Sequence, residues 1–358
     1  MMAGSAPIYT PARNLDRAME RILVVLPNWF GETLFATPFL RALREQCRSA
    51  EITALGWPAC RHVLLHNPHL HAFIEYDERG RHRSPSGKWR LLRAVRQGRF
   101  DTAFILRKSL SRTLLLWMAG IPTRIGFANP KSGWLLTHQV QPSTMPIHKA
   151  STYLPLLEAA GLSIVAGPYE YTVSEEEQAA ARELLKRERI VNRRPLVVVH
   201  PGANWPHKRW APERFAALAN RLVERHQAQV LITGAPADRD MAQIIHTSMS
   251  RPAVMLAGRT TLRELAACLP HAQLVISNDT GVLHIAAALH RPLVALYGPT
   301  SPALTGPLGD PTRMSVLHHA ECCPQIPCFH PDRPPHPGMD AITVEEAYDA
   351  SADLLEQG

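Results

Sequence analysis

Residues 273–300 read QLVISNDTGVLHIAAALHRPLVALYGPT, and this stretch decides the fold class. The apolar run from Gln273 to Ser277 is typical of a buried strand, and a polar turn follows it. A helix of small residues then passes through Ala286 to Ala288, and a second apolar run extends from Leu293 to Tyr297. Strand, helix and strand in this order predict a parallel βαβ crossover.

The turn between the first strand and the helix carries most of the chemistry of this stretch. A βαβ unit places free backbone N–H groups and the positive end of a helix beside that turn, which suits a phosphate. Asp279 and His284 add polar contacts of the kind that hold a sugar. The first hypothesis is therefore a nucleotide-sugar site.

Short β-rich runs alternate with amphipathic helices in both halves of the chain. The runs that predict strands are residues 21–26, 51–55, 101–106, 196–200 and 229–233, and those that predict helices are 33–44, 88–97, 109–119, 175–189, 212–222, 261–269 and 343–355. Such alternation predicts an α/β protein with two doubly wound parallel sheets that face each other across a central cleft. We expect an N-terminal domain over residues 1–170, a linker over 171–195, a C-terminal domain over 196–340 and a terminal helix over 341–358.

Composition limits the function classes. With 358 residues the chain can bury more than one core, and its net charge of +8 favours an anionic partner. The first twenty residues lack a continuous apolar stretch, and the longest comparable run, Leu114 to Ile121, is too short to cross a bilayer. Six cysteines are too few for a disulfide scaffold, so a reducing cytoplasm is expected.

The sequence lacks the motifs of two other function classes, dinucleotide-dependent dehydrogenases and proteins that bind nucleic acid. The turn after the first strand has no G-x-G-x-x-G pattern, which leaves a dinucleotide-dependent dehydrogenase unsupported. Residues 79–99 are basic, but only Trp89 interleaves the charges, so no nucleic-acid partner is expected. An anionic lipid headgroup fits this segment better.

Three polar turns follow predicted strands and lie at one edge of each sheet. Glu32 follows the first strand, where it is placed either as a general base or as a partner of the helix dipole. Lys208 and Arg209 follow residue 200 and can neutralise a diphosphate. After Gly234, Asp238 or Asp240 either holds ribose hydroxyls or caps a helix.

Cysteines gather near the C-terminus, at Cys322, Cys323 and Cys328, with His318, His319 and His330 close by in sequence. Two adjacent cysteines with prolines between the others do not match the paired C-x-x-C spacing of structural zinc sites. Structural or incidental cysteines are favoured over zinc, no metal site is expected, and the role of these thiols stays open.

Taken together, the motifs resemble glycosyltransferase family nine, the lipopolysaccharide ADP-heptosyltransferases. The residues that carry the resemblance are ILVVLPNWFGE at 22–32 with Ala36-Thr37-Pro38, HPGA at 200–203 with Lys208-Arg209-Trp210, SNDTG at 277–281, and YGPT at 297–300. The resemblance spans about residues 21–355. It implies the GT-B architecture, with Rossmann-like acceptor-binding and donor-binding domains and a final helix that folds back on the N-terminal domain. It also implies inverting transfer of heptose from ADP-heptose without a metal or other cofactor.

The resemblance also implies roles for individual residues. The family's proposed base is an aspartate, and Glu32 stands at that position here, one methylene longer. The implied catalytic residues are Glu32 and Lys208; the donor-binding residues are Lys208, Arg209, Thr233, Gly234, Asp238, Asp279, Thr280, Gly281 and His284; the acceptor-binding residues are Asn28, Trp29, Gly31, Lys108 and Arg112. The implied partners are an ADP-sugar and a lipopolysaccharide inner core, met at the cytoplasmic leaflet of the inner membrane by a peripheral enzyme.

Two alternatives remain open. One is a GT-B epimerase that cleaves a nucleotide sugar without an acceptor. The other is a catalytically inactive protein that binds anionic glycolipid, which the substitution at Glu32 favours.

Overall fold

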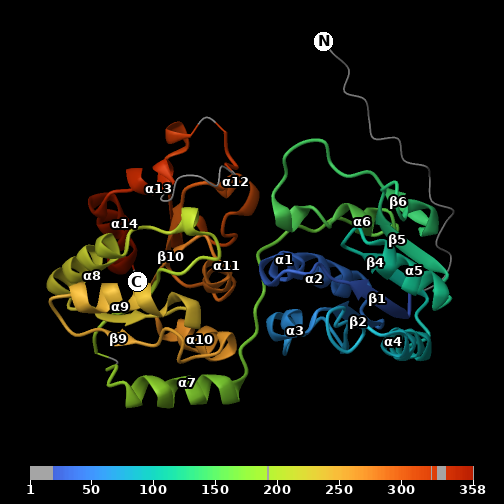
Figure 1. Cartoon of the computed structure of the whole chain (residues 1–358), viewed down its shortest axis with the longest axis horizontal. Coiled ribbons are helices and arrows are strands. Elements are labelled where there is room, and N and C mark those ends of the chain that lie inside the picture. Colours follow the sequence, from blue (N-terminus) through green and yellow to red (C-terminus); the bar gives the residue numbers. More distant parts are fainter. Residues whose placement is uncertain (1–18, 192, 324, 329–335, 358) are drawn as a thin grey trace, which may run out of the picture. The chain divides into compact units, whose positions relative to one another are not determined.

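The computed structural model describes residues 19–191, 193–323, 325–328 and 336–357, and the chain divides into two compact units, Met1–Gly167 and Pro168–Gly358 (Figure 1). The boundary falls just before the expected limit at residue 170. Among the described residues, no helix is both long and apolar enough to span a bilayer.

The first unit contains a parallel sheet of six strands in the order β3-β2-β1-β4-β5-β6. Its strands are β1 (Arg21–Val25), β2 (Glu51–Gly56), β3 (Ala72–Glu75), β4 (Thr102–Ile105), β5 (Thr123–Phe127) and β6 (His138–Val140). Its helices are α1 (Phe30–Phe35), α2 (Thr37–Gln46), α3 (Pro58–Leu64), α4 (Pro85–Gln97), α5 (Leu110–Met118) and α6 (Pro155–Glu158). The strand order reverses between β1 and β4, so the polar turns after these two strands lie at the position where open α/β sheets bind ligands.

The helix expected over residues 33–44 is in fact two helices. α1 starts earlier, at Phe30, and α2 begins at Thr37 with Pro38 in its first turn. Proline lacks the N–H that a continuous helix would need there, which explains the break. The interruption leaves α1 as a short helix that carries Glu32 in its first turn.

The second unit repeats the same strand order. Its parallel sheet runs β12-β11-β10-β7-β8-β9, which reverses between β7 and β10. The strands are β7 (Leu196–His200), β8 (Gln229–Ile232), β9 (Val254–Met255), β10 (Leu274–Asn278), β11 (Leu293–Tyr297) and β12 (Met314–His318). The helices are α7 (Glu175–Arg187), α8 (Pro212–His226), α9 (Arg239–Ser248), α10 (Leu262–Cys268), α11 (Gly281–Ala288), α12 (Pro302–Thr305), α13 (Pro337–Ala341) and α14 (Val344–Glu356).

Every residue of β7, β10 and β11 is buried, as expected for central strands covered by helices on both faces. Ser277 pairs with His200, and Asn278 pairs with Leu296, so the carboxyl ends of the three strands lie level. The turns that follow these strands therefore meet at one edge of the sheet.

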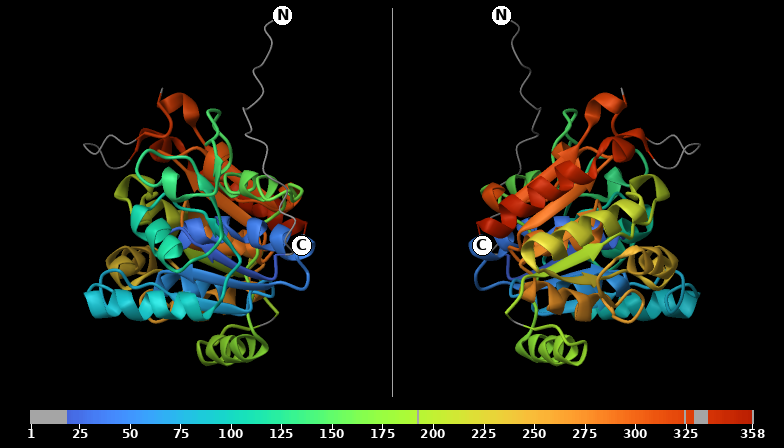
Figure 2. Two further views of the ribbon diagram at one scale, coloured as in Figure 1. Left: turned by 90° about the vertical axis from the view of Figure 1, so that its right-hand side faces the viewer. Right: turned by 90° about the vertical axis from the view of Figure 1, so that its left-hand side faces the viewer.

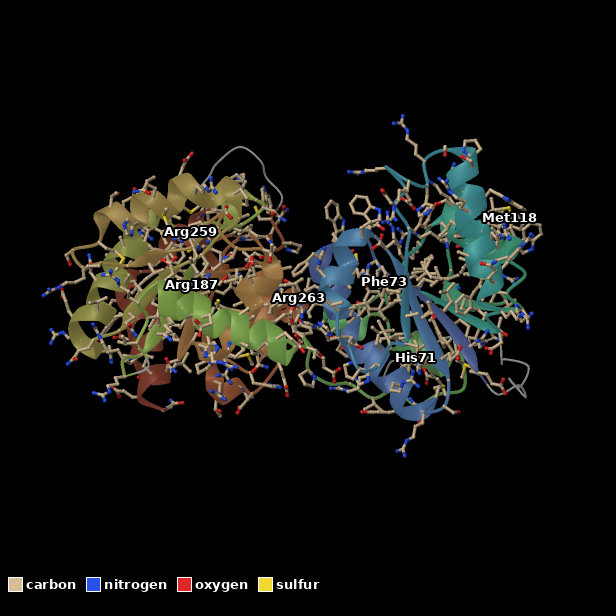
Figure 3. All side chains as sticks on the ribbon, turned by 90° about the horizontal axis from the view of Figure 1, so that it is seen from below. His71, Phe73, Met118, Arg187, Arg259 and Arg263 are labelled. Carbon is tan, nitrogen blue, oxygen red and sulfur yellow. The ribbon has the colours of Figure 1, made fainter. Side chains whose placement is uncertain are left out.

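The segment expected as a linker is an integral part of the second unit. α7 packs along α10, with Arg187 labelled on α7 and Arg263 on α10 in Figure 3. The Arg263 guanidinium pairs with the carboxylate of Glu177, and it donates a hydrogen bond of 2.9 Å to the carbonyl oxygen of Thr172. A charged helix thus docks through an ion pair, and the apolar pattern of the sequence could not indicate this.

The terminal helix, within the range 341–358 that was expected as a separate element, packs against the core of the second unit. α14 lies along α8 in Figure 2, and its buried residues Ala347 and Leu354 belong to the apolar core of the second unit. Its start is anchored there as well, because the indole N–H of Trp210 donates to the carbonyl oxygen of Ile342 at 3.0 Å. The apolar face of this helix is therefore satisfied within the second unit.

Candidate active site

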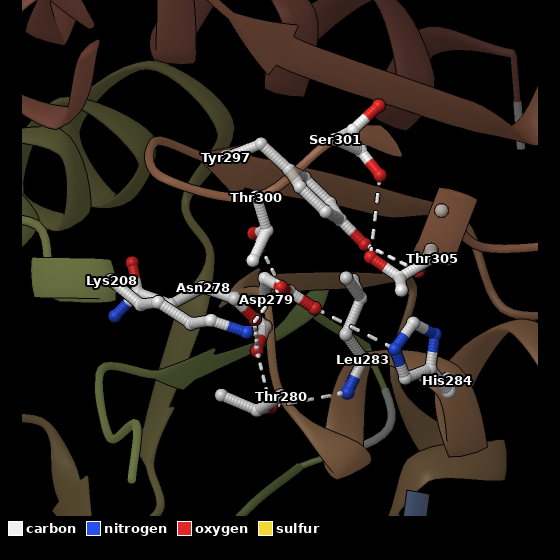
Figure 4. A network of polar contacts seen from close by, with 12 residues as sticks. Lys208, Asn278, Asp279, Thr280, Leu283, His284, Tyr297, Thr300, Ser301 and Thr305 are labelled. Atoms are coloured by element: carbon white, nitrogen blue, oxygen red, sulfur yellow. Dashed lines mark hydrogen bonds and ion pairs between the residues drawn. The ribbon is translucent and has the colours of Figure 1, made fainter. Parts of the chain in front are cut away.

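The centre of the candidate site is the carboxylate of Asp279, in the turn between β10 and α11. The ammonium group of Lys208 donates to Asp279 Oδ2 at 2.6 Å, and the hydroxyl of Thr300 donates to the same oxygen at 2.6 Å. Nε2 of His284 lies 3.6 Å from the other oxygen, Oδ1. Figure 4 shows these side chains converging from the turns after β7, β10 and β11 and from α11.

Asp279 is buried, with 7% of its surface exposed, yet it is held in its ionised form. Burial alone would raise the pKa of Asp279, but the hydrogen bond from His284 and the positive charge of Lys208 outweigh it and hold the pKa of Asp279 well below its usual range. The carboxylate therefore acts as a fixed negative charge that orients Lys208.

Lys208 retains the capacity to bind a second anion. It ends a short 3-10 helix, Pro206–Lys208, and its side chain is 22% exposed. An ammonium group has three N–H donors, and the contact with Asp279 uses one of them. The backbone at the start of α11 adds to this positive edge, because the first N–H groups of a helix have no partner within the helix. Thr280 caps the helix by accepting a hydrogen bond of 3.4 Å from the backbone N–H of Leu283.

Arg209 and Asp238, both expected to contact the donor, are engaged in holding the neighbouring turns. Arg209 donates to the carbonyl oxygen of Ala203 through Nε at 2.9 Å and through Nη2 at 2.7 Å. Asp238 Oδ2 accepts from the backbone N–H of Ala235 at 2.9 Å. A Cβ atom on Gly202 would lie 2.3 Å from that oxygen, so a larger residue there would displace the Asp238 carboxylate. Asp238 thus holds the turn that begins at Ala235, but its side chain forms no cap hydrogen bond with α9.

Thr233, Gly234 and Asp240 complete the set of residues expected around the donor. The Thr233 hydroxyl is fully buried and lies 3.0 Å from Nδ1 of His200, so it belongs to the interior. Gly234 packs closely on Asp238, whereas Asp240 is exposed in the first turn of α9. These three residues therefore lie in the turn after β8 and in the helix that follows it.

Tyrosine, threonine and asparagine residues that the sequence argument did not assign support this network. The Tyr297 hydroxyl donates to the carbonyl oxygen of Thr305 at 2.9 Å, and burial followed by the charge of Asp279 raises the pKa of Tyr297. The ring of Tyr169 meets that of His284 edge-on at 5.7 Å. Asn278 donates to the carbonyl oxygen of Pro201 at 2.7 Å and thereby ties β10 to the turn of Lys208. Asn278 and Thr300 lie within the SNDTG and YGPT motifs, so these motifs were the sequence feature that could have indicated their roles.

The first unit carries a separate polar turn after β1. Glu32 lies in the first turn of α1 and is partly exposed, and no other described residue forms a hydrogen bond or ion pair with its carboxylate. Trp29, just before the helix, is 68% exposed, and a Cβ atom on Gly31 would meet no atom within 4 Å. This turn thus presents a free carboxylate beside open space.

Arg112 was expected to contact the acceptor, but its side chain is only 1% exposed. The guanidinium donates to the carbonyl oxygen of Leu26 at 2.8 Å, to Oδ1 of Asn28 and to the carboxylate of Glu78 at 3.3 Å. We therefore interpret Arg112 as the residue that shapes the turn of Asn28. Lys108, which follows the neighbouring strand β4, is exposed at the same edge of the sheet.

Comparison with known proteins gives a consistent result. The sequence model of glycosyltransferase family 9 (heptosyltransferase) matches residues 88–331. The chain is 29% identical to lipooligosaccharide heptosyltransferase 2 of Haemophilus influenzae over 312 residues, which cover 84% of this chain and 89% of that protein. It is also 29% identical to lipopolysaccharide heptosyltransferase 2 of Escherichia coli K12, over 83% of this chain and 88% of that protein.

Two solved structures share the fold over nearly the whole chain. ADP-heptose lps heptosyltransferase II of E. coli is 26% identical with a TM-score of 0.79, covering 94% of this chain and 99% of that one. A glycosyl transferase family 9 protein of Veillonella parvula is 25% identical with a TM-score of 0.84, covering 96% and 99%. The predicted fold class, with two Rossmann-like doubly wound domains, is confirmed.

Proposed function

Because the chain belongs to glycosyltransferase family 9, the heptosyltransferase family, we propose that it transfers heptose from ADP-heptose to the inner core of lipopolysaccharide. The similarity to lipopolysaccharide heptosyltransferases and to the ADP-heptose lps heptosyltransferase II of E. coli supports this substrate pair. The observation that carries the proposal is the Lys208–Asp279 pair at the start of α11.

On the donor side, Lys208 and the start of α11 bind the pyrophosphate. As the bond between the anomeric carbon and the phosphate oxygen breaks, negative charge grows on the departing ADP. The ammonium group of Lys208 and the N–H groups of α11 stabilise this charge, and so they supply what a divalent cation supplies in other enzymes. Asp279 keeps the ammonium group in place, since its position is set by Thr300 and His284.

On the acceptor side, Glu32 acts as the general base. Its carboxylate takes the proton of the acceptor hydroxyl while that oxygen attacks the anomeric carbon from the face opposite ADP, so the configuration inverts. Lys108, at the neighbouring turn, adds positive charge that suits a phosphorylated or carboxylated acceptor.

The acceptor also determines where the enzyme works. A lipopolysaccharide inner core under construction is anchored in a membrane, so the protein acts as a peripheral enzyme on the cytoplasmic leaflet. Its net charge of +8 favours adsorption to anionic lipid, and this attraction weakens with salt.

The test combines ADP-heptose, an inner-core acceptor that lacks the terminal heptose, and the purified chain. We expect Glu32→Gln to lower kcat by roughly 100-fold or more while the Kd for ADP stays constant, and Glu32→Asp, which restores the family residue, to remain active. Near-normal transfer by Glu32→Gln would remove Glu32 from the mechanism.

The same assay separates the alternatives. ADP release that requires the acceptor supports transfer. ADP release from the donor alone, with an altered sugar, indicates an epimerase. Donor binding without ADP release under either condition indicates a catalytically inactive binding protein.

A further inference from the structure

Cys323, Cys328 and His336 form a compact cluster in the second unit. One ligand atom from each residue lies within 4.8 Å of the others. Cys328 and His336 are buried, with 6% and 3% of their surface exposed, and all three thiols from Cys322 to Cys328 are free. His330, which the sequence suggested as a neighbour, lies outside the described residues.

The spacing of these atoms suits a tetrahedral cation. Ligand atoms around tetrahedral Zn²⁺ lie roughly 3.6–3.8 Å apart, given bonds of about 2.3 Å to sulfur and 2.1 Å to nitrogen. The observed limit of 4.8 Å therefore requires only a small contraction by side-chain rotation. Two sulfur atoms and one imidazole are ligands that zinc and similar borderline cations prefer.

The His336 ring provides a second, independent observation. Its Nε2 is buried and has no hydrogen-bond partner in the described part of the chain, which is unfavourable for a polar atom unless something binds it. Nδ1 accepts a hydrogen bond of 3.1 Å from the backbone N–H of Gly338. Ligation through Nε2 moves the ring proton to Nδ1, so the Gly338 contact has to give way when the cation binds.

Further imidazoles stand close to the cluster. His207 and His318 are near enough to act electrostatically on the His336 ring. Both ring nitrogens of His207 and Nε2 of His318 are buried without a hydrogen-bond partner among the described residues. These nitrogens are suitable partners for a water molecule bound to a cation.

We propose that Cys323, Cys328 and His336 bind one divalent transition-metal cation of the Zn²⁺ class, with water at the fourth position. Both cysteines bind as thiolates, so two thiol protons pass to solvent when the cation enters. The proposal is independent of the transfer reaction, because no step of that reaction involves the cation.

The cation would brace the loop that follows β11. The backbone N–H of Cys328 donates to the carbonyl oxygen of Pro299 at 2.7 Å, and Met339 packs so closely on Gly298 that a Cβ there would lie 2.4 Å from its Cγ. Thr300, next in the chain, donates to Asp279. A cation held by Cys328 would therefore support the loop that orients the Asp279 carboxylate.

The first test measures metal on the full-length chain. Protein purified without chelator is analysed by elemental mass spectrometry for zinc, iron, cobalt, nickel and copper, and metal-free protein is titrated with Zn²⁺ and with Co²⁺. We expect about one equivalent per chain, and for Co²⁺ the absorption bands of tetrahedral thiolate coordination. Less than about a tenth of an equivalent, with no uptake of either ion, would overturn the proposal.

The second test assigns the ligands. Cys328→Ser and His336→Ala should each lose most of the bound metal, whereas Cys322→Ser, which alters the adjacent exposed thiol, should retain it. Alkylation of the wild-type chain, mapped by mass spectrometry, requires no variant to fold: Zn²⁺ should slow modification of Cys323 and Cys328 but not of Cys322. Equal modification of the three thiols, or a disulfide between Cys323 and Cys328 in metal-treated protein, would refute the assignment.

Discussion

Replacing Lys208 by methionine tests the central contact of the proposed donor site. The pair joins an ammonium group and a carboxylate at 2.6 Å. At an effective dielectric constant near 20 their attraction is about 6 kcal/mol, most of which the desolvation of both ions cancels. Removing one partner of a fully buried pair costs about 3–5 kcal/mol. Because the Lys208 side chain is 22% exposed, water can partly replace it, and we expect a loss of about 2 kcal/mol.

The measurement is a double-mutant cycle in urea. Lys208→Met, Asp279→Asn and the double variant are unfolded by urea, and the free energies of unfolding are compared with that of the wild type. The pair should show a coupling energy of about 2 kcal/mol. Lys186→Met is the matched control, since it removes an exposed lysine of the same unit and should change stability by less than about 0.5 kcal/mol.

Binding of ADP separates the two roles of Lys208. A charge-assisted hydrogen bond to phosphate contributes about 2 kcal/mol, so Lys208→Met should weaken ADP binding about 30-fold in calorimetry. The loss should persist when Asp279 is already Asn, because the donors that face the pyrophosphate are distinct from the one that Asp279 uses. A coupling energy near zero would refute the structural reasoning, and unchanged ADP affinity would refute the role in donor binding.

Three further predictions concern the framework around the site. Burial lowers the pKa of His200 to about 4, although the nearby charge of Asp238 raises it in part. The free energy of unfolding should therefore fall by about 3 kcal/mol as the pH drops from about 6.5 towards 4, because the unfolded chain takes up a proton that the folded chain does not. Urea unfolding of His200→Gln should show a flatter pH dependence. Arg112→Gln should destabilise the first unit by about 3 kcal/mol in calorimetry, since Glu78 and the turn lose a buried partner. Trp210→Phe should lower the free energy of unfolding by about 1–2 kcal/mol, because the carbonyl of Ile342 loses its indole donor.

The fold was predictable where burial leaves a direct mark on the sequence. The apolar runs at 196–200, 274–278 and 293–297 are central strands, and all their residues are buried. β9 was not predicted, because its two residues, Val254–Met255, are too few to show a periodic pattern. The packing of α7 was harder to predict from sequence. This helix buries only Ala181 and Leu185, and its position depends on an ion pair with α10. Two doubly wound parallel sheets follow from the pattern, and the GT-B architecture from the family resemblance, but the packing of α7 and α14 follows from neither.

The candidate site was predictable to the level of the turn. The sequence predicted that Glu32, Lys208 and Asp279 follow strands. The structure places the turns after β1 and β4, and after β7 and β10, at the reversals of the two sheets, where open α/β sheets bind ligands. The sequence did not show which of the polar side chains in these turns are buried. Arg112 looked like a free cation in sequence, and only the structure shows that its donors serve Leu26, Asn28 and Glu78.

The contrast between the two carboxylates bears on which of them is the base. Asp279 accepts hydrogen bonds from Lys208 and Thr300, and its pKa is held well below its usual range, so it is a poor proton acceptor at neutral pH. Glu32 has no such partner among the described residues, and its oxygens remain free to accept a proton from a substrate hydroxyl. A carboxylate that is fixed by its neighbours suits electrostatic positioning, whereas an unengaged one suits proton transfer. In the proposed mechanism, the extra methylene of Glu32 therefore changes the reach of the base and leaves its chemistry intact.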